Sequence, residues 1–107
     1  MIKLNIKPLS VNCAWQGKRY KTDEYKVYER NCLLLLPRIA IPEKPYCINI
    51  EVHFSSSASD LDNILKPFLD ILQKKYSIND KDIYKLIIEK RIVPKGQECI
   101  YFKIESI

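Results

Sequence analysis

Apolar and polar residues alternate at the start of the chain and again in its middle, and this period of two predicts β-strands. The first such stretch covers residues 2–7 and the second covers Tyr46–Phe54. In the second stretch the apolar side chains share one face and the polar side chains share the other, which is typical of a half-buried strand. Two further strands are expected at about 81–93 and 98–105, separated by a turn that contains Pro94 and Gly96.

Two segments have the patterning of amphipathic helices. The first should begin after Thr22, a good N-cap, and end at about Leu36, because Pro37 follows. The second should cover about 62–75. Its apolar stripe consists of Leu61, Leu65, Phe68, Leu69 and Leu72. Pro67 lacks an N–H group, so we expect a local kink in the first part of this helix.

The order of the predicted elements is βαβαββ, which is typical of an α+β fold. We therefore expect a small mixed β-sheet of about four strands with two main helices packed on it. A chain of 107 residues is long enough to bury about 65% of its unfolded surface. That supports one core but not two, so we predict a single domain over residues 1–107.

The charge balance favours a polyanionic partner. Lys and Arg number 18 against 13 Asp and Glu, which gives a formal net charge of +5. Many basic proteins bind no nucleic acid, so the charge alone does not decide the question.

The four cysteines are too scattered for a zinc site or a disulfide framework, because none forms a C-x-x-C pair. They are Cys13, Cys32, Cys47 and Cys99. We expect them to be small core residues in a reducing cytoplasm. The longest apolar run, Leu33–Leu36, is far too short to cross a bilayer, so no membrane association is expected.

Two acidic clusters are the strongest chemical signal in the chain. Asp60 and Asp62 come at a predicted loop-to-helix junction after the serine-rich stretch 55–59, and Lys66 follows Asp62 by one helical turn. Asp80 comes at the head of the next strand, and an antiparallel return of the chain would bring it beside Asp60. Three carboxylates would then meet around a hard cation such as Mg²⁺, as in enzymes that cleave phosphodiesters.

A purely structural interpretation of these residues stays open at this point. Asp62 or Asn63 is a suitable cap for the second helix, and Asp80 is suited to a turn with its neighbour Asn79. Lys66 has carboxylates within pairing distance along the helix on either side of it. A D-x-D pair by itself is a weak signal.

The order and spacing of these motifs are similar to those of the RusA family of Holliday-junction resolvases. The resemblance covers roughly residues 1–105. In the second half it rests on the D-L-D-N segment 60–63, Lys66 and the Asn79-Asp80 pair. In the first half it rests on Pro8, Ser10, Asn12, Trp15 and the segment 17–22, which has the sequence G-K-R-Y-K-T. One difference is the serine-rich stretch 55–59, where some members of the family carry basic residues.

The resemblance implies a homodimeric, Mg²⁺-dependent endonuclease, with Mn²⁺ as a possible substitute, that resolves four-way DNA junctions by paired symmetric nicks. Asp60, Asp62 and Asp80 match the metal-binding acidic residues of the family, and Lys66 matches its essential lysine. Asp82 is the alternative to Asp80 under a different alignment of the preceding loop.

We expect DNA contacts from a basic N-terminal loop and from the site lysine. The residues are Asn12, Trp15, Lys18, Arg19, Lys21 and Lys66. The lone histidine, His53, is expected to be a surface residue and not a metal ligand, because Mg²⁺ prefers oxygen. Two other functions stay open: a non-catalytic DNA-binding protein that recognises branched structures, and a metal-dependent nuclease for other branched nucleic acids.

Overall fold

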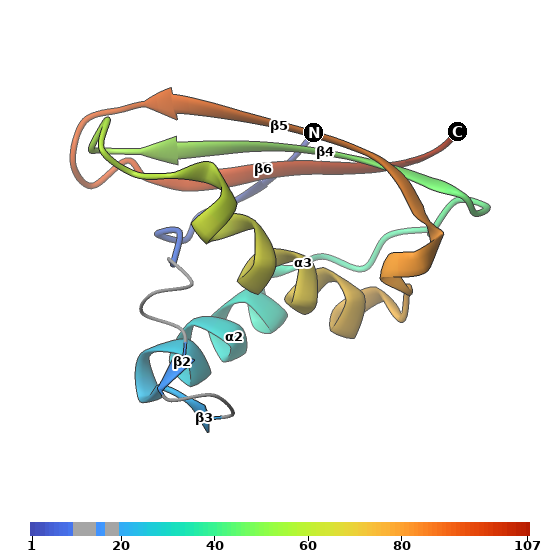
Figure 1. The fold of residues 1–107 in the computed structure, drawn as a ribbon, viewed down its shortest axis with the longest axis horizontal. Coiled ribbons are helices and arrows are strands. Elements are labelled where there is room, and N and C mark those ends of the chain that lie inside the picture. Colours follow the sequence, from blue (N-terminus) through green and yellow to red (C-terminus); the bar gives the residue numbers. More distant parts are fainter. Residues whose placement is uncertain (10–14, 17–19) are drawn as a thin grey trace.

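The computed structural model describes residues 1–9, 15–16 and 20–107, with side chains described for 1–9 and 22–107 (Figure 1). In chain order the elements are β1 (Ile2–Leu4), β2 (Trp15–Gln16), β3 (Tyr20–Lys21), α2 (Asp23–Leu35), β4 (Tyr46–Phe54), α3 (Leu61–Tyr76), the short 3-10 helix η1 (Asp80–Asp82), β5 (Ile83–Ile92) and β6 (Cys99–Ser106). The predicted α+β class is confirmed. The pairing of β2 with β3 is an addition that the sequence did not indicate.

The main sheet is mixed and has the strand order β1-β6-β4-β5. The central strand β4 runs antiparallel to β6 and parallel to β5, so that Ile50 lies between Phe102 and Ile88. On the far side of β6, the short strand β1 pairs antiparallel. This order leaves β5 as a ten-residue edge strand.

Both helices lie on the same side of this sheet (Figure 1). Every second side chain of β4 is buried, and these are Tyr46, Ile48, Ile50, Val52 and Phe54. Phe68 of α3 meets Phe102 of β6 edge to face, with 5.9 Å between ring centroids. Burial of these aromatic rings holds α3 firmly against the sheet.

The predicted helix boundaries are close to the observed ones. Thr22 caps α2, with its Oγ1 accepting a hydrogen bond from the Tyr25 N–H at 3.1 Å. Helix α3 begins at Leu61, one residue earlier than expected, and contains the buried Pro67. The first strand is shorter than predicted. It ends at Leu4, where a hydrogen bond from the Ile6 N–H to the Leu4 carbonyl turns the backbone.

The turn at 94–97 is present, but the strands on either side of it are not neighbours. The Gln97 N–H donates to the Pro94 carbonyl at 3.0 Å, and Gly96 has a positive φ of 95°. The chain passes from β5 across the end of β4 to β6.

Among the described residues, no helix combines the length and apolar character needed to span a membrane.

The parallel pairing of β4 and β5 determines where the ends of α3 lie. A parallel connection requires the chain to travel back along the sheet before the second strand begins, and α3 makes this return. The start and the end of α3 therefore lie at opposite ends of the sheet.

Candidate nuclease site

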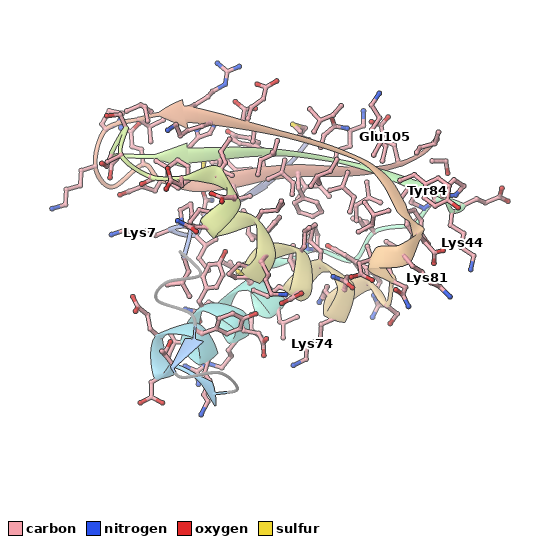
Figure 2. The ribbon with its side chains drawn as sticks, viewed as in Figure 1. Lys7, Lys44, Lys74, Lys81, Tyr84 and Glu105 are labelled. Carbon is pink, nitrogen blue, oxygen red and sulfur yellow. The ribbon has the colours of Figure 1, made fainter. Side chains whose placement is uncertain are left out.

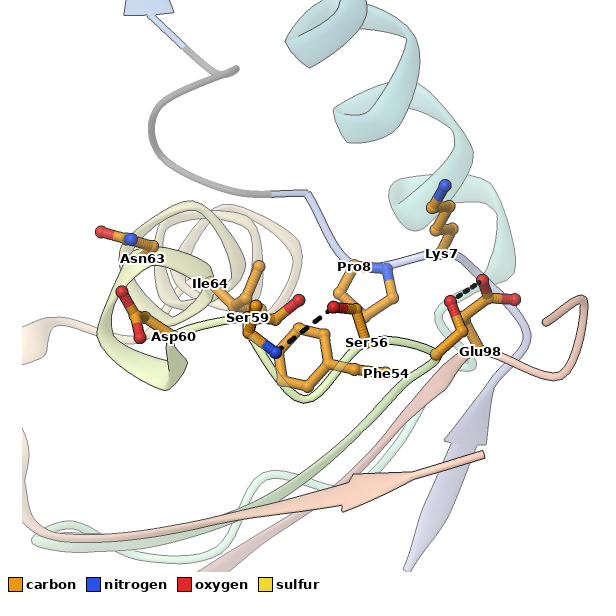
Figure 3. A pocket seen from close by; sticks show the side chains of 11 residues that line it. Lys7, Pro8, Phe54, Ser56, Ser59, Asp60, Asn63, Ile64 and Glu98 are labelled. Atoms are coloured by element: carbon orange, nitrogen blue, oxygen red, sulfur yellow. Dashed lines mark hydrogen bonds between the residues drawn. The ribbon is translucent and has the colours of Figure 1, made fainter. Parts of the chain in front are cut away.

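A hollow of about 450 Å³ opens at the N-terminal end of α3 (Figure 3). It is bounded by the end of β4, the serine-rich loop, the first turn of α3, and the segments around Pro8 and Glu98. Its polar lining residues are Lys7, Ser55, Ser56, Ser59, Asp60, Asn63 and Glu98. The serine-rich loop 55–59, which comes directly before the acidic motif in the sequence, therefore forms part of a concave surface.

Asp60 occupies the N-cap position of α3 without acting as a cap. Its backbone is extended, with φ −96° and ψ 133°, and its side chain makes no capping hydrogen bond. An N-cap Asp usually accepts a hydrogen bond from the second or third helical N–H group. The Asp60 carboxylate is exposed and lines the hollow, so it remains available to a ligand.

Asp62 and Lys66 lie further along the exposed side of α3. Asp62 is in the first turn, where the positive end of the helix dipole favours a carboxylate. The Lys66 ammonium lies 3.9 Å from the Asp70 carboxylate and is largely exposed. A pair of this kind contributes about 0.3–0.5 kcal/mol, so Lys66 can leave it at little cost.

The serine-rich loop is held by hydrogen bonds from within and from β5. The Ser56 hydroxyl accepts from the Ala58 N–H at 3.2 Å. Lys90 on β5 donates to the carbonyl oxygens of Ser57 and Ser59, at 3.1 and 3.0 Å. This lysine fixes the backbone immediately before Asp60.

Asp80 lies at the other end of α3, so the expected return of Asp80 to Asp60 within one chain is wrong. A 16-residue helix is about 24 Å long, and it separates the two acidic clusters. Figure 2 shows the same separation: Lys7 at the hollow and Lys81 beside Asp80 lie at opposite ends of the molecule. The physical reason is the parallel alignment of β5 with β4, where the sequence suggested an antiparallel return.

The neighbourhood of Asp80 differs from that of Asp82. Asp80 is exposed, and its backbone N–H donates to the Gln73 side chain at 3.2 Å. Asp82 is partly buried, and its carboxylate lies 3.9 Å from the Lys44 ammonium. Of the two, Asp80 has the more accessible carboxylate.

Glu98 and Lys7 also line the hollow, but the sequence did not identify either of them as a site residue. The pKa of the Glu98 carboxyl is lowered because its own backbone N–H, the Ser55 hydroxyl and the Gly96 N–H donate to it and Lys7 adds positive charge nearby. The Ser55 and Gly96 hydrogen bonds measure 2.9 and 2.7 Å. No sequence motif connects Glu98 with Asp60, because the two are joined only by the folding of β6 beside β4.

The described part of the chain contains no group of three His, Cys, Asp or Glu side chains placed to hold a metal ion. The carboxylates of Asp60 and Asp62 nevertheless have the oxygen chemistry that a hard cation prefers. The described residues thus bring the carboxylates of Asp60 and Asp62 to the start of α3.

A family model described as endodeoxyribonuclease RusA matches residues 10–100. The chain belongs to the RusA family. The match covers well over half of the 107 residues and includes both acidic clusters, α3 and most of the residues that line the hollow. No curated protein matches the chain.

Membership of the RusA family makes this chain an endodeoxyribonuclease of the Holliday-junction-resolving class. It therefore acts on branched DNA. The sequence resemblance is confirmed at the level of the family, whereas the roles of individual residues stay predictions.

The side chains of most of the expected DNA-binding residues lie outside the described part of this RusA chain. Asn12, Lys18 and Arg19 are among them. Trp15 is in β2 and Lys21 is in β3, but their side chains are likewise outside the description. The DNA contacts expected from this segment therefore stay predictions.

His53 lies on the face of the sheet away from α3. Its Nε2 is 3.2 Å from the Glu51 carboxylate, and its ring lies 5.0 Å from that of Tyr101. It does not line the hollow with Asp60.

Proposed function

We propose that this RusA-family chain is a Mg²⁺-dependent homodimeric endonuclease that resolves four-way DNA junctions by paired symmetric nicks during recombination and repair. The observation that carries the proposal is the uncapped carboxylate of Asp60, two residues from Asp62, at a hollow in a chain of this family. The uncapped state argues against a purely capping role for Asp60.

Asp60 and Asp62 would hold the Mg²⁺ ion, with Mn²⁺ as a substitute. Asp80 lies about 24 Å away in the same chain, so it would join them only from the other copy of the proposed dimer. When bound, this ion would lower the pKa of a coordinated water and neutralise charge on the phosphate. Lys66 would leave its weak pair with Asp70 and donate to a phosphate oxygen as negative charge builds there. The products would be nicks with 5′-phosphate and 3′-hydroxyl ends.

Two symmetric nicks in one junction favour a symmetric enzyme with one site in each half. A C2 dimer meets this requirement. Doubling the charge of +5 gives +10 for a dimer, a favourable field for the phosphates gathered at a crossover. The basic loop with Asn12, Trp15, Lys18, Arg19 and Lys21 would bind the arms. The cytoplasm is the compartment we propose, since Cys32, Cys47 and Cys99 are all free thiols.

An end-labelled synthetic four-way junction, compared with linear duplex of the same sequence, tests the proposal. We expect Mg²⁺-dependent, paired nicks in the junction alone, and no cleavage in EDTA. Asp62→Asn should abolish cleavage and retain junction binding. Asp70→Asn is the matched control on the same helix and should cut normally.

Other outcomes would point to the remaining interpretations. Binding of the junction without cleavage under any metal would indicate a non-catalytic DNA-binding protein. Equal cleavage of flaps, forks and junctions would indicate a nuclease of broader substrate range.

A further inference from the structure

The helices cover one face of the main sheet and, in the described part of the chain, leave the other face open (Figure 1). Paired residues of neighbouring strands place their side chains on the same face. Lys3 of β1 pairs with Tyr101 of β6, and Tyr101 pairs with Glu51 of β4. His53 follows Glu51 by two residues, so all four side chains share the open face.

At one end of this open face lies a groove of about 790 Å³. It is bounded by the segment after β1 and by the turn between β5 and β6. Its lining side chains include Lys3, Asn5, Lys7, His53, Gln97 and Tyr101. Lys7 and Glu98 line both this groove and the hollow beside Asp60, so the two concave surfaces adjoin.

Two aromatic rings lie side by side in the groove. The His53 ring is 5.0 Å from the Tyr101 ring, with 46° between their planes. These residues come from β4 and β6, the two central strands of the sheet, and both are partly exposed. Aromatic rings on the open face of a four-stranded sheet are a surface on which unpaired bases stack in nucleic-acid-binding proteins.

Positive charge borders these rings. The Lys3 ammonium lies 5.9 Å from the centre of the Tyr101 ring, and Lys7 is exposed where the groove meets the hollow. A contact between a cation and an exposed ring is weak, so Lys3 can move to a phosphate and leave the ring to a base.

Two carboxylates close to the rings are already engaged within the chain. The Glu51 carboxylate lies 3.2 Å from Nε2 of His53 and also pairs with Arg91 of β5. Glu98 accepts two hydrogen bonds from its neighbours. These interactions offset the negative charge beside the groove and leave the two lysines to an anionic ligand.

The chemistry of the groove favours a single strand of nucleic acid. Of the large apolar side chains that are exposed in the described residues, none lines the groove, so it lacks the apolar centre of a protein interface. A duplex keeps its bases stacked on one another, whereas a single strand offers both base faces for the rings and phosphates for the lysines.

We propose that this groove binds single-stranded DNA, with bases stacked on Tyr101 and His53 and phosphates held by Lys3 and Lys7. Because Lys7 borders both surfaces, a strand in the groove continues toward the hollow at Asp60. Binding in the groove needs neither metal nor cleavage, so it does not rest on the proposed nuclease function.

Fluorescence anisotropy in EDTA, with a labelled oligothymidine of about 12 nucleotides, measures this binding. We expect Tyr101→Leu to weaken the affinity by about 10-fold or more through lost stacking, and Tyr101→Phe to bind as the wild type does. Lys3→Gln should weaken the affinity and reduce the slope of log K against log salt concentration by about 0.7, the value for one phosphate of a single strand.

Tyr84→Leu and Lys74→Gln are matched controls outside the groove. Tyr84 is 72% exposed on β5, and Lys74 is exposed on α3, on the helix side of the sheet (Figure 2). Both variants should bind the oligonucleotide as the wild type does. Urea unfolding shows whether Tyr101→Leu is folded.

A cross-linking measurement on the wild type does not depend on the folding of any variant. An oligonucleotide that contains 5-iododeoxyuridine cross-links under ultraviolet light to an aromatic side chain stacked on the modified base. Digestion and mass spectrometry should place the cross-link on Tyr101 or His53.

Three results would overturn the proposal. These are cross-links confined to residues 10–21, an unchanged affinity in folded Tyr101→Leu, and an equal loss of single-strand and duplex binding in that variant. The last result would show a general DNA-binding surface without selectivity for unpaired bases. Failure of the wild type to cut junctions would contradict the proposed function alone.

Discussion

The ammonium group of Lys90 on β5 donates a hydrogen bond to the carbonyl oxygen of Ser59, at 3.0 Å. A second bond reaches Ser57 at 3.1 Å, so one side chain holds the backbone that leads to Asp60. We expect Lys90→Met to lower cleavage by about 10- to 100-fold, the cost of a small misplacement of a reacting group. Single-turnover cleavage at saturating enzyme measures this loss.

Lys95→Met is the matched control for Lys90→Met. Lys95 is exposed in the turn after β5, so its replacement removes the same charge from an exposed position. Sedimentation of both variants separates a positioning effect from a loss of assembly. Equal loss of cleavage in the two variants would show that Lys90 acts through its positive charge and not through its hydrogen bonds to the loop.

Lys66 and Asp70 form an exposed pair, and we expect the two residues to differ sharply in importance. Lys66→Ala should lower the cleavage rate by about 10²–10³-fold, as for removal of a group that stabilises developing charge. Asp70→Asn should leave the rate unchanged, because the pair contributes little. Rates measured at saturating Mg²⁺ and junction check both statements, and an equal loss in Asp70→Asn would assign the lysine a structural role.

Glu98 lines the same hollow as Asp60, but its carboxylate already accepts hydrogen bonds from Ser55 and Gly96. We expect Glu98→Gln to change cleavage by no more than about twofold, as for most surface substitutions. The Mg²⁺ concentration for half-maximal rate should be unchanged, whereas Asp62→Asn should raise it or abolish activity. A strong shift in the Mg²⁺ requirement of Glu98→Gln would make Glu98 a ligand.

Two buried groups predict a loss of stability in alkali. Burial raises the pKa of the Cys32 thiol from 9.0 to about 12, and burial also raises the pKa of Tyr28 well above 10. The folded state therefore holds protons that the unfolded state releases. Their contribution is complete below pH 9 and is lost as the pH rises through the folded pKa values, by about 1.4 kcal/mol per pH unit for each group.

Urea unfolding at pH 8 and pH 11 measures this dependence. Tyr28→Phe should reduce the difference in the free energy of unfolding between the two pH values. Tyr84→Phe, at a position 72% exposed, should not change it. An unaltered pH dependence in Tyr28→Phe would place the alkaline loss elsewhere.

The elements of the fold were predictable where local patterning determines them. The alternation in β4 and the Thr22 cap of α2 depend on residues close in sequence, and both are observed. The strand order was not predictable, because β6 inserts between β1 and β4 through pairings between residues far apart in the sequence, such as Ile2 with Phe102 and Tyr46 with Ser106. The parallel alignment of β5 follows from packing of α3 and has no local signal.

The same distinction applies to the site. Asp60, Asp62 and Lys66 lie within seven residues, and their spacing is enough to predict that they share one end of α3. Glu98 reaches the hollow through the pairing of β6, and Lys90 reaches the serine loop from an edge strand. Neither position is marked by a motif in the sequence, so neither residue could be assigned to the site in advance. The position of Asp80 depends on the direction of β5, which periodicity does not reveal.

The 24 Å between the acidic clusters also affects how such an enzyme responds to its own abundance. Under the proposed function, a chain without a partner would bring only part of the carboxylate set to the start of α3 and would not cut DNA. Below the dissociation constant of the dimer, the amount of active enzyme rises with the square of the chain concentration. The cleavage activity would therefore be very low at low chain concentration and would rise steeply as more of the protein is made.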